Sequence, residues 1–314
     1  MKRILLAGCY LISFSYLYAL SGPQDPKGKA EAVSLFGKPL YPPPLPAKTS
    51  KELEENVAKA RAAYERDPGS AETTIWFGRR MAYLWRYRDA ITIFTRGIKR
   101  FPQDARLYRH RGHRYITLRE FDRAIEDLQK AHMLTAGEED EVEPDGQPNT
   151  LNIPTGTLQT NILYHLALAF YLKGDFHSAM THFRKCRELA KNDDMRVAAT
   201  DWEYMAFRRM GPVIDGPDLL KDIRKDMAII ENVAYHRRLL LYKGELPVDS
   251  LLNMEKATGL DLATYGYGVG NWYLYNGDTE RARQIFEKVL AGSHWAAFGY
   301  IAAEADLKRM PASK

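Results

Sequence analysis

The sequence predicts an all-α fold: a right-handed helical solenoid made of antiparallel helix pairs. The first observation behind this prediction is a repeat of 34 residues in which several positions agree at once. The second is that apolar residues recur at helical spacing within each unit. The third is a set of turn signals rich in Gly, Asp and Pro, which end one helix and let the next fold back on it.

Two consecutive units, residues 71–104 and 105–138, define the repeat. A small residue in the first helix lets the second helix cross it closely, and an alanine early in the second helix does the same from the other side. Large apolar residues then fill the remaining space. The matching pairs, each 34 residues apart, are Gly78 with Gly112, Tyr87 with Phe121, and Ala90 with Ala124.

Two further units lie at 160–193 and 263–296. Each has a glycine and an aspartate at the turn between its helices, Gly174-Asp175 in the first and Gly277-Asp278 in the second. Between these units the register weakens. There we expect one helix over 196–210 and one or two more over 219–242, followed near the C-terminus by a capping helix over 297–309.

Residues 1–21 are expected to be a signal peptide or an N-terminal anchor. Lys2 and Arg3 precede an uncharged apolar run over 4–20, the layout of a secretory signal with cleavage before Gly22. The run is shorter than the roughly 20 residues that a transmembrane helix needs, but an uncleaved anchor remains an alternative. A third alternative is lipidation of Cys9, which ends a lipobox-like Leu-Ala-Gly-Cys sequence. The protein is therefore expected to be exported, in the periplasm or attached to the envelope, with membrane contact only through this segment.

A Pro-rich linker is expected over 22–50, because five prolines between 39 and 46 favour extended backbone. The solenoid then occupies 51–314. Residues 137–157 interrupt it as a loop insertion without helical period, and six acidic residues lie between 138 and 145. Such a loop is either a solvated acidic surface or a functional segment.

The composition favours a binding protein over an enzyme or a nucleic-acid binder. The net charge of +5, with 27% charged residues, is too weakly basic for a dedicated nucleic-acid binder. The sequence has no Gly-rich phosphate loop, nucleophile elbow or zinc-binding helix, so no cofactor and no catalysis are expected. His110 and His113 share a helical face, but the arginines beside them would repel a metal ion. Once a signal is removed, Cys186 alone remains, which excludes an intramolecular disulfide.

The 34-residue register of 71–138 resembles the tetratricopeptide-repeat (TPR) family. This resemblance implies a solenoid whose concave groove is lined by the first helix of each pair and binds a protein or peptide. Residues 267–278, followed by Arg281, Ala282 and Phe286, also resemble the new lipoprotein I family of outer-membrane TPR lipoproteins. That second resemblance implies an adaptor for periplasmic proteases and peptidoglycan hydrolases.

When each unit is aligned to the TPR register, the groove is expected to be cationic at its N-terminal end. At its C-terminal end it is expected to be aromatic and amide-rich. Arginine can fork onto a carboxylate, while Tyr and Asn can hydrogen-bond an extended peptide backbone. Alternatively, the arginines only solvate the surface or pair with the acidic loop at 138–145. The expected peptide-binding residues are Arg79, Tyr83, Arg106, Arg109, His113, Asn161, Tyr164, Tyr267 and Asn271.

The sequence therefore predicts an exported, non-catalytic TPR adaptor that binds a protein or peptide in its concave groove. The alternative is a scaffold subunit of an envelope complex that docks through its convex or terminal faces, for example through Phe298 or Tyr300 of the capping helix. Aromatic-rich repeat helices can also self-associate, so the sequence leaves a homodimer open.

Overall fold

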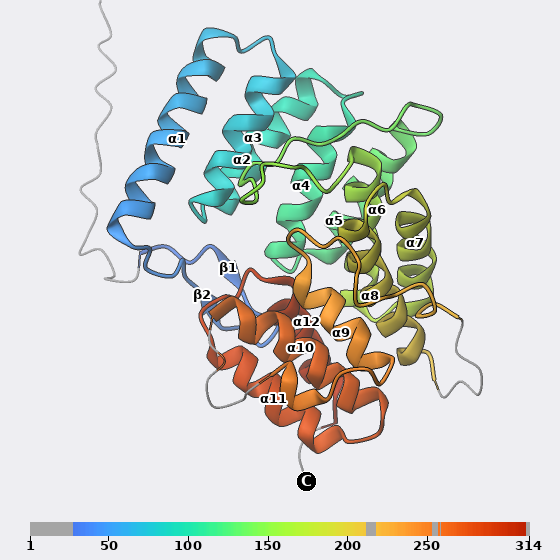
Figure 1. Cartoon of the computed structure of the whole chain (residues 1–314). Coiled ribbons are helices and arrows are strands. Elements are labelled where there is room, and N and C mark those ends of the chain that lie inside the picture. The colour runs from blue at the N-terminus through green and yellow to red at the C-terminus, as the bar shows by residue number, and fades with distance from the viewer. Residues whose placement is uncertain (1–27, 212–217, 253–256, 258, 312–314) are drawn as a thin grey trace, which may run out of the picture.

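A computed structural model describes residues 28–211, 218–252, 257 and 259–311. This part of the chain is a run of helices, each packed against the next, as predicted for an all-α solenoid of helix pairs (Figure 1). The helices are α1 Ala47–Arg66, α2 Ala71–Tyr83, α3 Tyr87–Arg100, α4 Ala105–Thr117, α5 Phe121–Leu134, α6 Leu158–Lys173, α7 Phe176–Leu189, α8 Asp193–Arg209, α9 Val233–Tyr242, α10 Gly259–Tyr275, α11 Thr279–Ala291 and α12 Phe298–Arg309.

Local sequence explains where many of these helices begin. A polar side chain just before the helix accepts a hydrogen bond from a backbone N–H of its first turn, which would otherwise have no partner. At α6 this becomes a capping box, in which Thr157 and Thr160 bond reciprocally. The capping residues are Ser70 for α2, Asp104 for α4, Thr157 for α6, Asp175 for α7, Asn192 for α8 and Asp278 for α11.

Glycines in the first helices lie where the paired helix comes closest. A Cβ on Gly78 would lie 2.4 Å from the Phe94 ring, and one on Gly270 would lie 2.5 Å from the Phe286 ring. Gly268 has a different reason: its Cβ would lie 2.2 Å from Nε of Arg238, a side chain that is fully buried and paired with Asp201. Glycine at 268 thus lets a buried arginine pass directly against α10.

The weak-register region differs in part from the prediction. The helix expected over 196–210 is present as α8, but over 219–242 only α9 forms, and residues 218–232 run without an α-helix. The carboxylate of Asp194 on α8 accepts hydrogen bonds from the backbone N–H groups of Ile230, Glu231 and Asn232 at 2.8–2.9 Å. These backbone groups are therefore satisfied by a side chain instead of by a helix.

The Pro-rich segment is not a free spacer over the residues that the structure describes. It forms a small hairpin of β1 (Ala32–Val33) and β2 (Pro39–Leu40), and α1 already begins at Ala47. The backbone N–H of Leu35 donates to Glu304 at 2.7 Å, and the Trp295 indole donates to the carbonyl of Tyr41 at 2.6 Å. Residues near the N-terminal end of the described chain are thereby fixed to its C-terminal helices.

A buried arginine completes this closure. Arg119, in the turn between α4 and α5, donates to Glu304 of α12 at 2.9 Å and to the carbonyl of Trp295 at 2.8 Å. The side chains of Arg119 and Glu304 are only 3% and 1% exposed. The solenoid therefore closes on itself, and α12 contacts α6 as well as its neighbours α10 and α11.

Within the described residues, no helix is both long enough and apolar enough to cross a bilayer. The expected signal or anchor at 1–21, including Cys9, lies outside those residues.

Replacing Arg119 by Met should lower the free energy of unfolding by about 3–5 kcal/mol, because Glu304 would remain buried without its countercharge. Urea unfolding of the full chain measures this effect. Arg61→Met is the matched control: Arg61 pairs with Glu65 at 2.8 Å on the exposed face of α1, where a surface ion pair contributes at most about 1 kcal/mol. Equal losses in the two variants would contradict the closure.

Candidate functional site

A cavity of about 370 Å³ lies on the concave side of the solenoid, lined by α2, α4, α6, the start of α12 and the acidic insertion. A second cavity of about 410 Å³ adjoins it and shares His113, Tyr235 and Phe298. Of the nine residues expected to bind a peptide, six line the first cavity: Arg79, Tyr83, Arg109, His113, Asn161 and Tyr164.

The other three do not reach this cavity. Arg106, at the N-terminal turn of α4, pairs with Asp104 and Glu72, each at 2.7 Å. Tyr267 and Asn271 are fully buried in α10; the Tyr267 hydroxyl lies 3.0 Å from a carboxylate oxygen of Asp306, on α12. The aromatic and amide-rich C-terminal groove is therefore absent at these positions, because neighbouring helices cover that face of α10.

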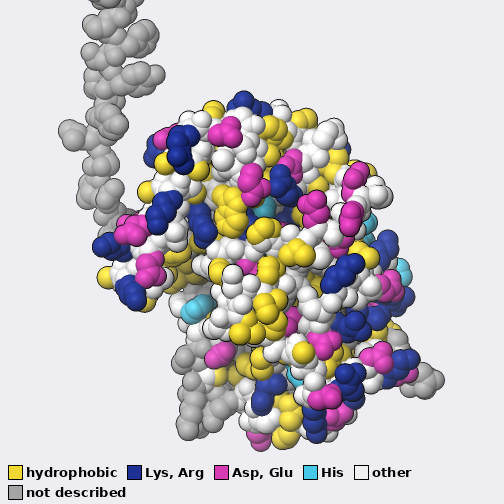
Figure 2. Space-filling view, turned by 45° about the horizontal axis from the view of Figure 1, so that its top comes forward, with side chains coloured by type: hydrophobic (Ala, Val, Ile, Leu, Met, Phe, Trp, Pro, Cys, Tyr) yellow, Lys and Arg dark blue, Asp and Glu magenta, His cyan; other side chains and the backbone are white. Residues whose placement is uncertain are grey.

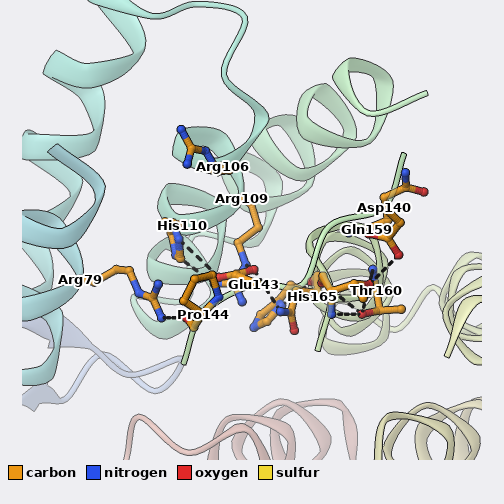
Figure 3. Close-up of polar contacts among 12 residues, drawn as sticks. Arg79, Arg106, Arg109, His110, Asp140, Glu143, Pro144, Gln159, Thr160 and His165 are labelled. Atoms are coloured by element: carbon orange, nitrogen blue, oxygen red, sulfur yellow. Dashed lines mark hydrogen bonds and ion pairs between the residues drawn. The ribbon is translucent and has the colours of Figure 1, made fainter. Parts of the chain in front are cut away.

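The acidic insertion docks onto the N-terminal part of the groove (Figure 3). Oε2 of Glu143 lies 3.1 Å from Nε of Arg109 and accepts a hydrogen bond from Asn161 at 3.0 Å. Its Oε1 lies 3.4 Å from Nε2 of His110. The carbonyl of Pro144 accepts from Arg79 at 2.7 Å. For Arg79 and Arg109, the structure thus shows contact with the acidic loop, whereas Arg106 pairs with Asp104 and Glu72.

The base of the insertion is tied to α6. The backbone N–H of Glu143 donates to the carbonyl of Gly156 at 3.1 Å, and that of Leu158 donates to Glu141 at 2.8 Å. The carboxylate of Asp140 accepts from the Thr157 hydroxyl at 2.6 Å. These bonds hold Glu143, which is 9% exposed, in the cavity wall.

Residues 144–153, which we call the strap, extend from this base across the groove to α2. The carbonyl of Gly146 accepts from Arg80 at 2.7 Å. A Cβ on Gly146 would lie 1.8 Å from the Tyr83 hydroxyl, so the backbone lies directly on that side chain. The strap therefore contacts the groove mainly through its own backbone, as a bound peptide would.

The charges of the cavity nearly cancel, which corrects the expectation of a cationic groove. Three guanidinium groups, from Arg79, Arg109 and Arg114, face three carboxylates, from Glu143, Asp145 and Glu231. Burial, helped by the nearby Glu231, raises the pKa of Asp145. Over the face shown in Figure 2, basic and acidic side chains are likewise interspersed.

Arg114 is the exception among these charges. Within the described part of the chain its guanidinium makes no hydrogen bond or ion pair, and its closest aromatic neighbour is the Tyr87 ring at 5.5 Å. Burial lowers the pKa of Arg114 to about 10, so it is still charged at neutral pH. A half-buried cation without a counterion among the described residues, at the wall of a cavity, is suited to receive a carboxylate.

Aromatic rings form the floor of the cavity. The rings of His113 and His165 lie 4.2 Å apart, and the Phe298 ring lies 5.3 Å from the first and 5.6 Å from the second. Burial, followed by the nearby arginines, holds the pKa of both histidines well below 6.5, so they are neutral at pH 7. His165 uses Nδ1 to donate to the carbonyl of Asn161 at 2.6 Å.

Sequence reasoning did not assign Arg114, His165 or Phe298 to this site. His165 could have been found, because it lies four residues after Asn161 and so shares its helical face. Phe298 could not have been found, because it enters the cavity only through closure of the solenoid. No group of three or more His, Cys, Asp or Glu side chains within the described ranges could hold a metal ion.

Comparison with known proteins finds one repeat family and several similar solved structures. The family model for the tetratricopeptide repeat matches residues 160–193, the third unit. Among solved structures, the chain is similar to YrrB, described as a TPR protein with an unusual peptide-binding site, at 15% identity over 80% of this chain and 98% of that one, with a TM-score of 0.40.

Two other solved structures are similar. A TPR protein from Parabacteroides merdae shares 13% identity over 83% of this chain and 100% of its own, with a TM-score of 0.45. The anaphase-promoting complex (APC/C) heterotetramer Cut9–Hcn1 shares 15% identity over 83% of this chain and 46% of that one, with a TM-score of 0.35. No curated protein matches the chain.

Acid should destabilise the fold through the histidines of the cavity floor. The unfolded chain binds a proton at His165 near pH 6.5, whereas the folded chain resists it, so stability is lost as the pH falls through about 6.5. His165→Gln should reduce the loss between pH 6.5 and 5.5 by up to about 1.4 kcal/mol per pH unit. Urea unfolding at each pH measures this change, with His177→Gln, on the exposed side of α7, as the control. An unchanged pH dependence in His165→Gln would contradict the assignment.

Proposed function

We propose, from the premise that this chain is a tetratricopeptide-repeat protein, that it is a non-catalytic adaptor which binds a segment of a partner protein in the cavity between α2, α4, α6 and α12. The observation that carries this proposal is the uncompensated Arg114 in a preformed concave cavity. TPR proteins bind proteins and peptides, and this cavity lies where the first helices of the repeats converge.

The lining suits a peptide better than a compact small molecule. Arg114 can receive a carboxylate, and the hydroxyl of Tyr83 and the amide of Asn161 can hydrogen-bond a backbone. The floor of His113, His165 and Phe298 can take an apolar side chain. Two adjoining cavities of about 370 and 410 Å³ give room for successive side chains of an extended segment.

Arg114→Gln should weaken peptide binding at least tenfold, because a charge-assisted hydrogen bond to a half-buried guanidinium contributes roughly 1.5–3 kcal/mol. The peptides would be selected from a random display library on the immobilised full chain, and their Kd measured by fluorescence polarisation. Arg106→Gln is the matched control: it is an arginine on the same helix, but it lies outside the cavity and pairs with Glu72 and Asp104.

Equal Kd values for both variants and the wild type would place binding elsewhere and favour the alternative function, a scaffold that docks through an outer face. One observation favours that alternative: a hollow of about 450 Å³ between the N-terminal hairpin and helices α11 and α12, beside Phe36, which is 48% exposed. Phe298 and Tyr300 do not serve such docking, because Phe298 lines the concave cavity and Tyr300 is 7% exposed.

We also propose that the protein is exported and works at the cell envelope, as an adaptor of the new lipoprotein I kind. Support comes from the basic and apolar segment at 1–21 and from residues 267–278. Fractionation of the native cells and N-terminal sequencing of the protein should find it in the envelope or periplasm, beginning at Gly22. A lipidated N-terminus at Cys9 would still place the protein at the envelope, but with a lipid anchor. A soluble cytoplasmic protein beginning at Met1 would contradict export.

A further inference from the structure

We propose that the strap is a displaceable internal competitor of the partner, and that the partner contributes an acidic extended segment that binds Arg79, Arg80 and Arg114 when the strap leaves. This inference rests on the proposed function of the groove. It adds the chemical class of the partner and a means of regulating access to the site.

The base of the insertion and the strap are held to the solenoid in different ways. The base is held by backbone bonds to α6 and by the buried Glu143. The strap is held on the groove by two side-chain donors, Arg79 to Pro144 and Arg80 to Gly146. A third bond, from Asn149 to Glu231 at 3.2 Å, is exposed. The strap can therefore leave while the base stays folded.

The strap leaves much of its apolar surface exposed. Leu151 and Ile153, its two large aliphatic side chains, are 61% and 49% exposed. Burial of apolar area is the main stabilising contribution for a docked segment, and here most of it is missing. A partner with better apolar contacts to the aromatic floor of the cavity would therefore displace the strap.

Displacement of the strap would leave positively charged side chains on the groove without partners. When the strap leaves, the carboxylate of Asp145 leaves with it, while Glu143 stays on Arg109. Arg79 and Arg80 then lose their carbonyl partners and join Arg114, which has none among the described residues. Arg79 and Arg114 line the cavity, and Arg80 follows Arg79 on α2, so these guanidinium groups together favour a segment with carboxylates.

The strap and a partner would also compete for the same surface of Tyr83. The backbone of Gly146 occupies the surface of Tyr83 so closely that a methyl group at 146 would overlap the hydroxyl. Two backbones cannot share that surface, so a partner that reaches Tyr83 must replace the strap. Binding and strap docking are then mutually exclusive.

The test uses the full chain and a fluorescent synthetic peptide of residues 141–149, Glu-Val-Glu-Pro-Asp-Gly-Gln-Pro-Asn, as the acidic probe. In one variant a Gly/Ser sequence of equal length replaces residues 144–153. We expect this variant to bind the peptide at least tenfold more tightly than the wild type. Adding Arg79→Gln and Arg80→Gln to it should abolish the gain, whereas adding Arg106→Gln should not. Raising the salt concentration should weaken binding.

A second variant guards against misfolding of the first. Gly146→Ala changes one methyl group, yet its Cβ would overlap Tyr83 and lift the strap. It should also increase affinity for the acidic peptide. The control peptide carries Gln or Asn in place of each acidic residue and should bind neither variant.

If the wild type and both variants bound the acidic peptide with equal affinity, the strap would not be a competitor. If the control peptide with Gln or Asn bound as tightly as the acidic peptide, the partner segment would not need to be acidic. These failures differ from failure of the proposed function. If library peptides still bind the wild type and lose affinity in Arg114→Gln, the groove function stands while the strap inference falls. If no peptide depends on Arg114, both fall.

Discussion

The buried ion pair of Arg119 and Glu304 closes the solenoid. It joins the second repeat to α12, and the same carboxylate also holds the backbone of Leu35 in the N-terminal hairpin. α12 lies beside α6, held there by this pair and by Arg309 of α12, which donates to the carbonyl of Leu172 in α6. Because it does, Phe298 reaches His113 and His165, and a shallow groove becomes a floored cavity.

The same closure explains two unusual turns. Gly174 and Gly277 take a left-handed conformation between paired helices, but Trp85 and Arg119, 34 residues apart, adopt it with full side chains, at φ 61° and 67°. Both side chains reach Trp295: the ring of Trp85 lies 5.1 Å from it, and Arg119 binds its carbonyl. The backbone cost of these turns is therefore offset by contacts that hold the ends of the solenoid together.

Much of the fold could be predicted from the sequence, because the 34-residue register, the capping residues and the small packing residues are local signals. Six cavity residues followed from the same register. The burial of Tyr267 and the entry of Phe298 could not be predicted, because both depend on how far the solenoid curves before it closes. Pairing of Glu143 with Arg109 was one of several alternatives, since a loop without periodicity carries no signal for where it docks.

The proposed function requires that a partner enter the concave cavity. Photo-crosslinking in the native cells tests it most directly, with p-benzoylphenylalanine placed at Tyr83, in the cavity wall, or at Met133, which is 64% exposed on α5. We expect a covalent adduct to a partner protein from position 83 and none from position 133. An adduct from position 133 alone would contradict it and would place the partner on the outer surface of the solenoid.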